Sequence, residues 1–518
     1  MLKHFVIMAC FLLSACGMVG PDYKEPQKSV AKNWLKKSQA VNNKPVKDAS
    51  WWTVFHDPNL TALINSGYQN NLSLQSAAVR VLQARAQLAQ SVGELYPQQQ
   101  AITGNYNYNR IGGSSLQMVL PPVFETALMG FSANWEIDFW GKYRRAIQSN
   151  EATFLASFAA YDNALITLTA DIASAYITIR TDERLIHITQ QNIKLQQMSL
   201  KLTQSRYRAG QISLMDVEQA TTELNETEAT LPALISQLQT QKDALAVLLG
   251  ITPDKVDSLL LKKQGIPVAP KTVAVGIPID TLEKRPDIYQ AREEAIAQSA
   301  SIGAVKANLY PAFSLSGTFA FASNNIYGSS VADLFSWSNR TITAGPGLNW
   351  PIFNYGQITN AVRTQDAAFQ QALLKYLNLV LKAQQEVQDN ITRFIESKKS
   401  EQFLTTAARS AIKATQLSII RYREGETDYT SVLYAEQQQL RVQTSQVRSQ
   451  GDVPLALVAL YRALGGGWQI RKGNDIIPKP IKAEMAARTN WGKLLTQQAH
   501  QPPVNKKQKI EQLYLPSW

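Results

Sequence analysis

The sequence contains two copies of one unit, displaced along the chain by about 215 residues. Matching motifs keep an offset of 214 residues in one case and 215 in the others: Tyr96-Pro97 with Tyr310-Pro311, Asn134-Trp135 with Asn349-Trp350, Gly141 with Gly356, Arg206-Tyr207-Arg208-Ala209-Gly210 with Arg421-Tyr422-Arg423-Glu424-Gly425, and Leu249-Gly250 with Leu464-Gly465. Chance does not readily hold one offset over about 150 residues, so an internal duplication is the better explanation. Any fold for this chain must therefore contain the same set of elements twice.

The duplication sets the expected domain boundaries. We predict six segments: a signal peptide at 1–15, an N-terminal segment at 16–56, repeat 1 at 57–252, a proline-rich linker at 253–279, repeat 2 at 280–467 and a polar basic tail at 468–518.

Each repeat carries two segments that alternate with period two. From Ala127 to Phe139 the odd positions are apolar or aromatic and the even positions are mostly polar, and the second copy repeats this from Thr341 on the opposite parity. We therefore predict strands at about 98–110, 127–139, 312–323 and 341–353. Strands of 9 to 11 or more residues with one apolar face are typical of outer-membrane β-barrels, whereas the alternative, a soluble sandwich, has shorter strands.

Between the strands the apolar period becomes helical. In repeat 1, apolar residues recur every seven positions, at Phe158, Leu165, Ile172, Ile179, Ile186, Ile193 and Leu200. No proline interrupts residues 141–210, so one coiled-coil-like helix of about 65 residues is predicted, with a length of roughly 100 Å at 1.5 Å per residue. Basic residues followed by Gly210 or Gly425 are typical of a helix C-terminus. Each repeat is thus expected to form a long helical hairpin with a tight tip, near 206–213 in repeat 1 and near 421–428 in repeat 2.

The N-terminus has the features of a bacterial export signal. Lys3 and His4 precede the apolar run Phe5 to Leu13, and Leu13-Ser14-Ala15 precedes Cys16. This order resembles a lipobox, in which the cysteine is acylated and becomes the mature N-terminus; the alternative is an ordinary signal peptide with an incidental cysteine. After the leader no run of about 18 apolar residues occurs, so we expect no transmembrane helix.

Charge and motif content argue against several function classes. The net charge is +12, but half of it lies in the tail from Ile470, and elsewhere no groove-like basic array with interleaved aromatics occurs, so nucleic-acid binding is not expected. The chain has four histidines and no cysteine after Cys16, and no nucleophile or phosphate-loop motif. We therefore expect no enzyme activity, no metal site and no cofactor.

The strand pattern also predicts oligomerisation. Four strands cannot close a barrel, and an open sheet edge in lipid leaves backbone groups without partners at a cost of several kcal/mol each. Three copies would supply twelve strands, with the duplicated helices continuing below them as a tube. The fold class is therefore a mixed α/β membrane protein in which a trimeric β-barrel leads into a periplasmic α-barrel.

Several motifs together resemble the outer-membrane efflux protein family, the TolC-like ducts, and in particular its lipoprotein branch that serves resistance-nodulation-division pumps. The resemblance covers about residues 16–467 and rests on these segments: Cys16 to Tyr23, Trp51-Trp52, Asp57-Pro58, Ala84-Arg85-Ala86, Trp135-Glu136-Ile137-Asp138 with Gly141, and Arg285-Pro286-Asp287. It implies a homotrimeric, lipid-anchored outer-membrane channel that works passively with a periplasmic adaptor and an inner-membrane pump in multidrug-type efflux. Alternatives are a duct for secreted polypeptides and a lipid-anchored coiled-coil scaffold.

The resemblance also implies roles for residues of the tips. By position, the adaptor contacts would be Arg206, Tyr207, Gly210, Arg421, Tyr422 and Gly425, and the tunnel constriction would include Asp216, Asp428, Thr430 and Tyr434. Relatives often carry an aspartate where Tyr434 stands and an aliphatic residue where Thr430 stands, so this sequence departs from the usual acidic ring at these two positions. Asp216 and Asp428 could supply negative charge or could cap helices.

Overall fold

The computed structural model describes residues 17–34, 40–42, 49–112, 121–260, 265–276, 278–326 and 330–500. Two helices dominate it, α4 and α9, each 67 residues long and each starting after a glycine in the left-handed region, Gly141 and Gly356. The helices are α2 Pro58–Asn70, α3 Leu72–Gly93, α4 Lys142–Arg208, α5 Leu214–Leu249, α6 Val256–Leu259, α7 Pro278–Glu283, α8 Pro286–Lys306, α9 Gln357–Arg423, α10 Tyr429–Ala463 and α11 Lys479–Arg488. The repeat offset predicted from the sequence is thus preserved in the long helices, and the duplication is confirmed.

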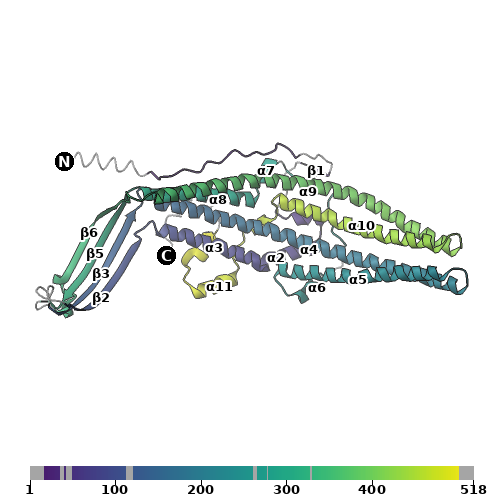
Figure 1. The fold of residues 1–518 in the computed structure, drawn as a ribbon, viewed down its shortest axis with the longest axis horizontal. Coiled ribbons are helices and arrows are strands. Elements are labelled where there is room, and N and C mark those ends of the chain that lie inside the picture. Colours follow the sequence, from purple (N-terminus) through teal and green to yellow (C-terminus); the bar gives the residue numbers. More distant parts are fainter. Residues whose placement is uncertain are drawn as a thin grey trace.

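One four-stranded antiparallel sheet extends from one end of the helices, and the helical tips lie at the other end (Figure 1). Its strands are β2 Gln99–Arg110, β3 Val123–Ile137, β5 Ala312–Asn324 and β6 Arg340–Asn349, in the spatial order β2-β3-β5-β6. A second, two-stranded sheet pairs β1 Val41–Asn42 in parallel with β4 Val273–Ala274. The N-terminal segment is therefore tied to the segment between the repeats.

Two strands differ in extent from the prediction. β3 starts at Val123 rather than near 127, because its first residues pair with the end of β2, where Val123 lies opposite Arg110. β6 stops at Asn349 rather than 353, since Pro351 cannot donate to a ladder and the amide of Ile352 instead turns back to the carbonyl of Trp350, at 2.9 Å.

The main core lies midway along α4, where the predicted heptad positions are buried. Leu165, Ile172 and Ile179 are fully buried against α2, α3 and the C-terminal half of α10, and Trp51 stacks on Tyr461 at 5.3 Å between ring centroids. Ile186 and Leu200, nearer the tip, are only half-buried. The helical assembly is therefore packed most tightly at its middle and more loosely toward the tips.

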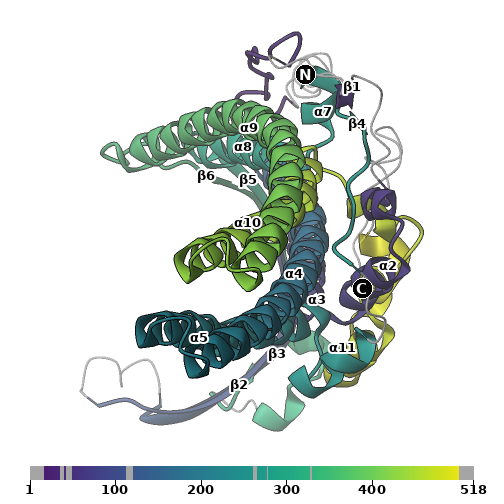
Figure 2. The same cartoon turned by 90° about the vertical axis from the view of Figure 1, so that its right-hand side faces the viewer.

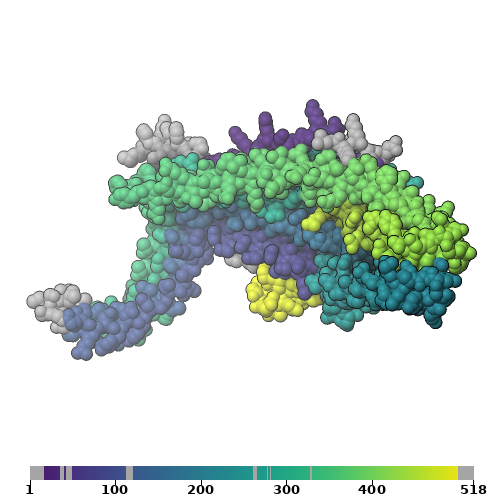
Figure 3. All heavy atoms as spheres, turned by 45° about the vertical axis from the view of Figure 1, so that its right-hand side comes forward, coloured from purple at the N-terminus to yellow at the C-terminus, as the bar shows by residue number. Residues whose placement is uncertain are grey.

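The C-terminal tail folds onto this middle region as far as residue 500. Ile476, Ile477 and Met485 join the main core, and Arg471 forms a bidentate ion pair with Asp162 of α4, with Nη2 2.7 Å from Oδ2. In Figure 2 α2 and α11 both lie on the same side of the arc formed by the long helices, and in Figure 3 the tail stands as a separate yellow mass on the helical body. The sequence predicted no structure for the tail; its conformation is set by packing onto α3 and α4.

Candidate functional site: the sheet, its junction with the helices, and the tips

The strand register divides the large sheet into two chemically different faces. Across β3, β5 and β6, Phe131 lies opposite Phe319, which lies opposite Ile342, while the neighbouring row joins Ser132, Thr318 and Thr343. The predicted alternation therefore holds across all three strands, with apolar side chains aligned on one face and hydroxyls and amides on the other.

The apolar face is exposed in the protomer. Its large side chains are between 39% and 74% exposed: Ile102, Tyr106, Tyr108, Met129, Phe131, Leu315, Phe319, Ile342 and Leu348. A contiguous exposed apolar face of this kind marks a surface that contacts lipid or another protein. β2 and β6 each have one neighbour within the described sheet, so their other edges offer hydrogen-bonding groups to further strands.

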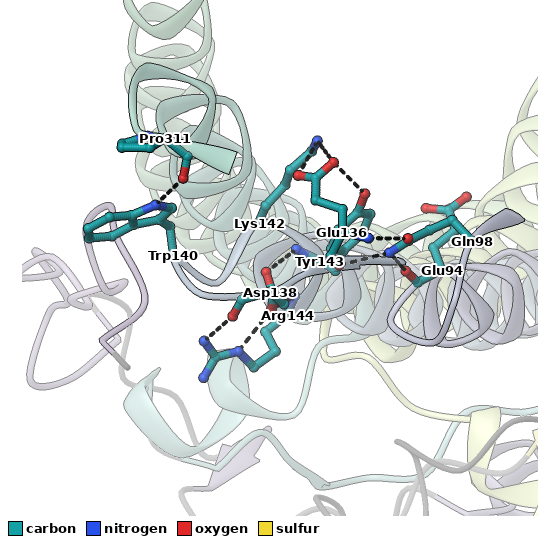
Figure 4. A network of polar contacts seen from close by, with 9 residues as sticks. All are labelled: Glu94, Gln98, Glu136, Asp138, Trp140, Lys142, Tyr143, Arg144 and Pro311. Carbon is teal, nitrogen blue, oxygen red and sulfur yellow. Dashed lines mark hydrogen bonds and ion pairs between the residues drawn. The ribbon is translucent and has the colours of Figure 1, made fainter. Parts of the chain in front are cut away.

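A polar network joins the sheet to α4 (Figure 4). The Gln98 side chain bridges to the backbone of Glu136, donating to its carbonyl at 3.1 Å and accepting from its amide at 2.7 Å. The Glu136 carboxylate accepts from Lys142 at 3.1 Å and from the Tyr143 hydroxyl at 3.2 Å. The end of the strand is thereby clamped to the first turn of the long helix.

Asp138 belongs to the same junction and corrects the predicted extent of the strand. The alternation placed it on the polar face of a strand at about 127–139, but its carboxylate accepts from the backbone amides of Tyr143 and Arg144 and from the Arg144 guanidinium, at 2.9 to 3.0 Å. It satisfies amides at the start of α4 that have no partner within the helix. The strand has already ended at Ile137, so the period-two rule no longer applies at Asp138.

The backbones of the two tips are equivalent. Gly210 and Gly425 both have positive φ, +72° and +82°, and their amides donate to the carbonyls of Tyr207 and Tyr422 at 2.8 and 3.1 Å. Both helices therefore end in the left-handed C-terminal cap that the sequence predicted.

The side chains of the two tips are not equivalent. Arg206 reaches from α4 to the second hairpin, where Nη1 donates to the Tyr422 carbonyl and the guanidinium lies 4.7 Å from the centroid of the Tyr422 ring. Its repeat counterpart, Arg421, remains exposed and pairs with Glu426 at 3.3 Å. Tyr422 is buried against Tyr429, with ring centroids 5.6 Å apart, whereas its counterpart Tyr207 is 43% exposed. Burial raises the pKa of Tyr422.

The four residues expected at the constriction fall into two groups. Asp216 forms a capping box with Ser213, at 3.2 Å to its amide, and Asp428 caps α10 by accepting from the Ser431 amide, also at 3.2 Å. Thr430 is exposed, and Tyr434 is 64% exposed with its hydroxyl accepting from Gln438 at 3.2 Å. Helix capping therefore accounts for both aspartates in the protomer.

Sequence reasoning missed a buried polar layer just behind the tips. Glu436 of α10 is 1% exposed and Glu223 of α5 is 7% exposed, and both face α4 through Ser199 and Gln196. The available signal was the spacing of Val432, Glu436 and Gln439, which repeats every three to four residues as core positions do.

The N-terminal segment runs along α8 and α9 from the base of the sheet (Figure 1). Arg145 of α4 holds it by donating to the Val19 carbonyl at 3.1 Å and pairing with Asp22 at 2.9 Å. Cys16, the predicted acylation site, lies outside the described residues. Within the described part of the chain, no helix combines the length and the apolar character that a bilayer-spanning helix requires.

A two-faced sheet at one end of very long paired helices defines the class of outer-membrane channel subunits. The sequence profile described as outer membrane efflux protein matches residues 63–251 and 277–466. The chain belongs to this family, and it is the outer-membrane channel subunit of an efflux system.

Individual relatives are similar to this chain along nearly its whole length. The chain is 29% identical over 492 residues to Nodulation protein T of Rhizobium leguminosarum bv. viciae, covering 95% of this chain and 97% of the relative. It is 29% identical to the Toluene efflux pump outer membrane protein TtgC of Pseudomonas putida, covering 90% and 96%. The outer-membrane channel OprN is similar in structure, with a TM-score of 0.81 and 28% identity over 87% of this chain and 99% of OprN. The MtrE channel of Neisseria gonorrhoeae in its open state, at 22% identity and a TM-score of 0.74 over 88% of this chain and 99% of MtrE, supports the fold.

Proposed function

We propose that three copies of this chain form one continuous duct, anchored in the outer membrane through acylated Cys16 and fed by a periplasmic adaptor and an inner-membrane resistance-nodulation-division pump. The observation that carries the proposal is the sheet, whose exposed apolar face and open β2 and β6 edges suit a barrel closed by identical neighbours in lipid. Twelve strands result from three copies, and the polar face then lines the passage.

Anchoring through Cys16 is supported by the course of the next residues. Val19 and Asp22 are bound to Arg145 at the start of α4, and Gly20 packs against Gly303, so the segment that follows Cys16 is fixed beside the base of the sheet. An acyl chain attached a few residues earlier would be close to the inner leaflet of the outer membrane. Metabolic labelling with palmitate tests this, and the Cys16→Ser variant should lose the label.

The tips are the proposed meeting point with the adaptor. Tyr207, Gly210, Arg421 and Gly425 are exposed there and are offered as adaptor contacts. Arg206 and Tyr422, which the family resemblance placed in the same group, hold the two hairpins together and would act on the adaptor indirectly.

The proposed constriction lies beside these tips. Asp216, Asp428, Thr430 and Tyr434 are proposed to surround the narrowest part of the tunnel. Thr430 and Tyr434 expose their side chains there, whereas the two carboxylates also serve as caps.

Reconstitution tests the duct directly. Purified full-length protein in planar bilayers should give conductance steps, and detergent-solubilised protein should have the mass of a trimer. A periplasmic coiled-coil scaffold would give no conductance. A duct for secreted polypeptides would conduct as well, but it would co-purify with a pump other than a resistance-nodulation-division transporter.

A further inference from the structure

A set of buried polar side chains lies between the two helical hairpins. We call it the polar layer; its members are each less than 9% exposed: Asn192, Gln196 and Ser199 of α4, Glu223 of α5, and Glu436 and Gln439 of α10. Ser199 lies seven residues before Arg206, or roughly 10 Å along the helix at 1.5 Å per residue. The layer therefore lies directly behind the tips, at the interface that must change if the hairpins separate.

Most side chains of the polar layer take part in hydrogen bonds that side-chain amides donate from one helix to another. Gln439 donates to Asn192 at 3.1 Å across the α10–α4 contact. The two oxygens of Glu223 accept from Gln196 at 3.2 Å and from Gln437 at 2.7 Å. Such hydrogen bonds hold the helices in register, and hydrogen bonds to water can replace them when the helices separate.

Glu436 is a carboxyl group in this layer that accepts no hydrogen bond from a side-chain amide in the ranges that the structure describes. One of its oxygens, Oε1, accepts from the Ser199 hydroxyl, while the other, Oε2, is buried with no hydrogen-bond partner among the described residues. The groups that face it are Ser199 from α4, Glu223 from α5 and Tyr429 from its own helix, and Thr415 of α9 binds the adjacent carbonyl of Ala435 at 2.9 Å. None of these groups is a cation, and Glu223 is a second carboxylate.

This environment disfavours a charged Glu436. Burial raises the pKa of Glu436 to about 7, helped by the nearby Glu223 and opposed by the hydrogen bond from Ser199. A carboxyl group exposed by separation of the hairpins would return to its ordinary pKa near 4.5. The packed arrangement therefore binds a proton that the separated arrangement releases over the range between these two values.

We propose that the polar layer is a proton-controlled joint, in which neutral Glu436 keeps α10 packed on α4 and its ionisation beside Glu223 releases the tips. The inference rests on the proposed duct function. The packed state holds the extra proton, so the equilibrium favours it most strongly at low pH. The ratio of packed to separated hairpins then falls as pH rises from about 4.5 to about 7, by at most about tenfold per pH unit. Above that range the effect levels off.

The test is single-channel recording of the full-length protein in planar bilayers, with the pH of the tip side varied from about 5 to about 8, across the range that the linkage sets. The wild type should show an open probability that rises several-fold up to about pH 7. Glu436→Gln keeps the shape and an acceptor for Ser199 but cannot ionise, so it should stay mostly closed at every pH.

A second variant changes the neighbour instead of Glu436 itself. Glu223→Gln removes the like charge, so the pKa of Glu436 in the packed state should fall toward its ordinary value. The rise in open probability should then be smaller and should level off at a lower pH than in the wild type.

The matched control is Glu226→Gln, which changes an exposed carboxylate on α5, the helix that carries Glu223, and should keep the wild-type pH profile.

A second readout is hydrogen exchange of the α10 backbone amides around Glu436. In the wild type this exchange should become faster with pH by more than the intrinsic rate does, and in Glu436→Gln it should not. If Glu436→Gln has normal conductance and the same pH profile as the wild type, the proposed proton-controlled joint is wrong, whereas the proposed duct is not contradicted. Absence of conductance in the wild type at all pH values would instead overturn the proposed function.

Discussion

Arg206 on the first hairpin binds the backbone carbonyl of Tyr422 on the second hairpin and lies over the ring of the same tyrosine. The repeat counterpart of this arginine, Arg421, pairs with Glu426 of its own tip. The duplication thus supplies two similar tips, and the first of them provides the arginine that links the two hairpins.

This asymmetry predicts that the two arginines differ in effect. Arg206→Gln removes a charge-assisted hydrogen bond and a cation–π contact, a loss of about 1 to 3 kcal/mol, and should raise the open probability in planar bilayers by roughly fivefold to a hundredfold. Arg421→Gln is the matched control, since its ion pair is exposed and contributes about 0 to 1 kcal/mol. Equal leakage from both variants would contradict the proposed linking role.

The tail is predicted to depend on the ion pair between Arg471 and Asp162. Arg471→Ala leaves the Asp162 carboxylate buried without its cation, which should destabilise the middle region by about 3 kcal/mol at neutral pH. Limited proteolysis should then cut after residue 470, and thermal unfolding should occur at a lower temperature. Arg488→Ala, at an exposed position of α11, serves as control.

The same pair predicts a pH dependence of stability in the Arg471→Ala variant. Burial raises the pKa of Asp162 to about 6 even with Arg471 present, and the loss of this cation should raise it further. Because the folded state then holds the proton more tightly than the unfolded state, stability should fall as pH rises from about 4 through 6. A melting temperature of the variant that rises with pH over this interval would contradict the assignment.

The orientation of the sheet can be tested with two adjacent residues. Phe319 lies on the apolar face and Thr318 on the polar face of β5. Phe319→Arg should cost about 2 to 4 kcal/mol if that face meets lipid near the middle of the bilayer, and should reduce the amount of trimer recovered from outer membranes. Thr318→Arg should leave assembly intact and shift the ion selectivity of the channel toward anions. A reversed pattern would place the polar face outward.

Gly303 of α8 packs closely against the N-terminal segment, and a larger side chain at this position tests that contact. A Cβ added at Gly303 would lie 2.5 Å from the Val19 carbonyl and 2.9 Å from the Arg145 side chain. Gly303→Ala should therefore displace residues 17–22 from α8 and expose them to protease. Gly93→Ala, at the end of α3 with no atom within 4 Å of the added Cβ, should leave the digestion pattern unchanged.

Local periodicity and repeated spacing in the sequence were sufficient to define the four long strands and the long helical hairpins of this protein. Period two specified which residues of β3 and β5 share a face, and a proline-free heptad pattern specified the length of α4. Glycine at 210 and 425 marked where the long helices end, since a left-handed residue is needed there. These features require no knowledge of what lies across the interface.

How equivalent residues diverge depends instead on packing in three dimensions. Arg206 and Arg421 occupy equivalent positions of the repeated Arg-Tyr-Arg motif, yet Arg206 is the one that faces the other hairpin, because the packing of the two hairpins brings Tyr422 within its reach. The burial of Glu436 likewise depends on α4 and α5 closing over α10, and the tail is held by Asp162, 309 residues away from Arg471 in the chain. Contacts of this kind depend on which helix faces which, and helical periodicity specifies a buried face without specifying its partner.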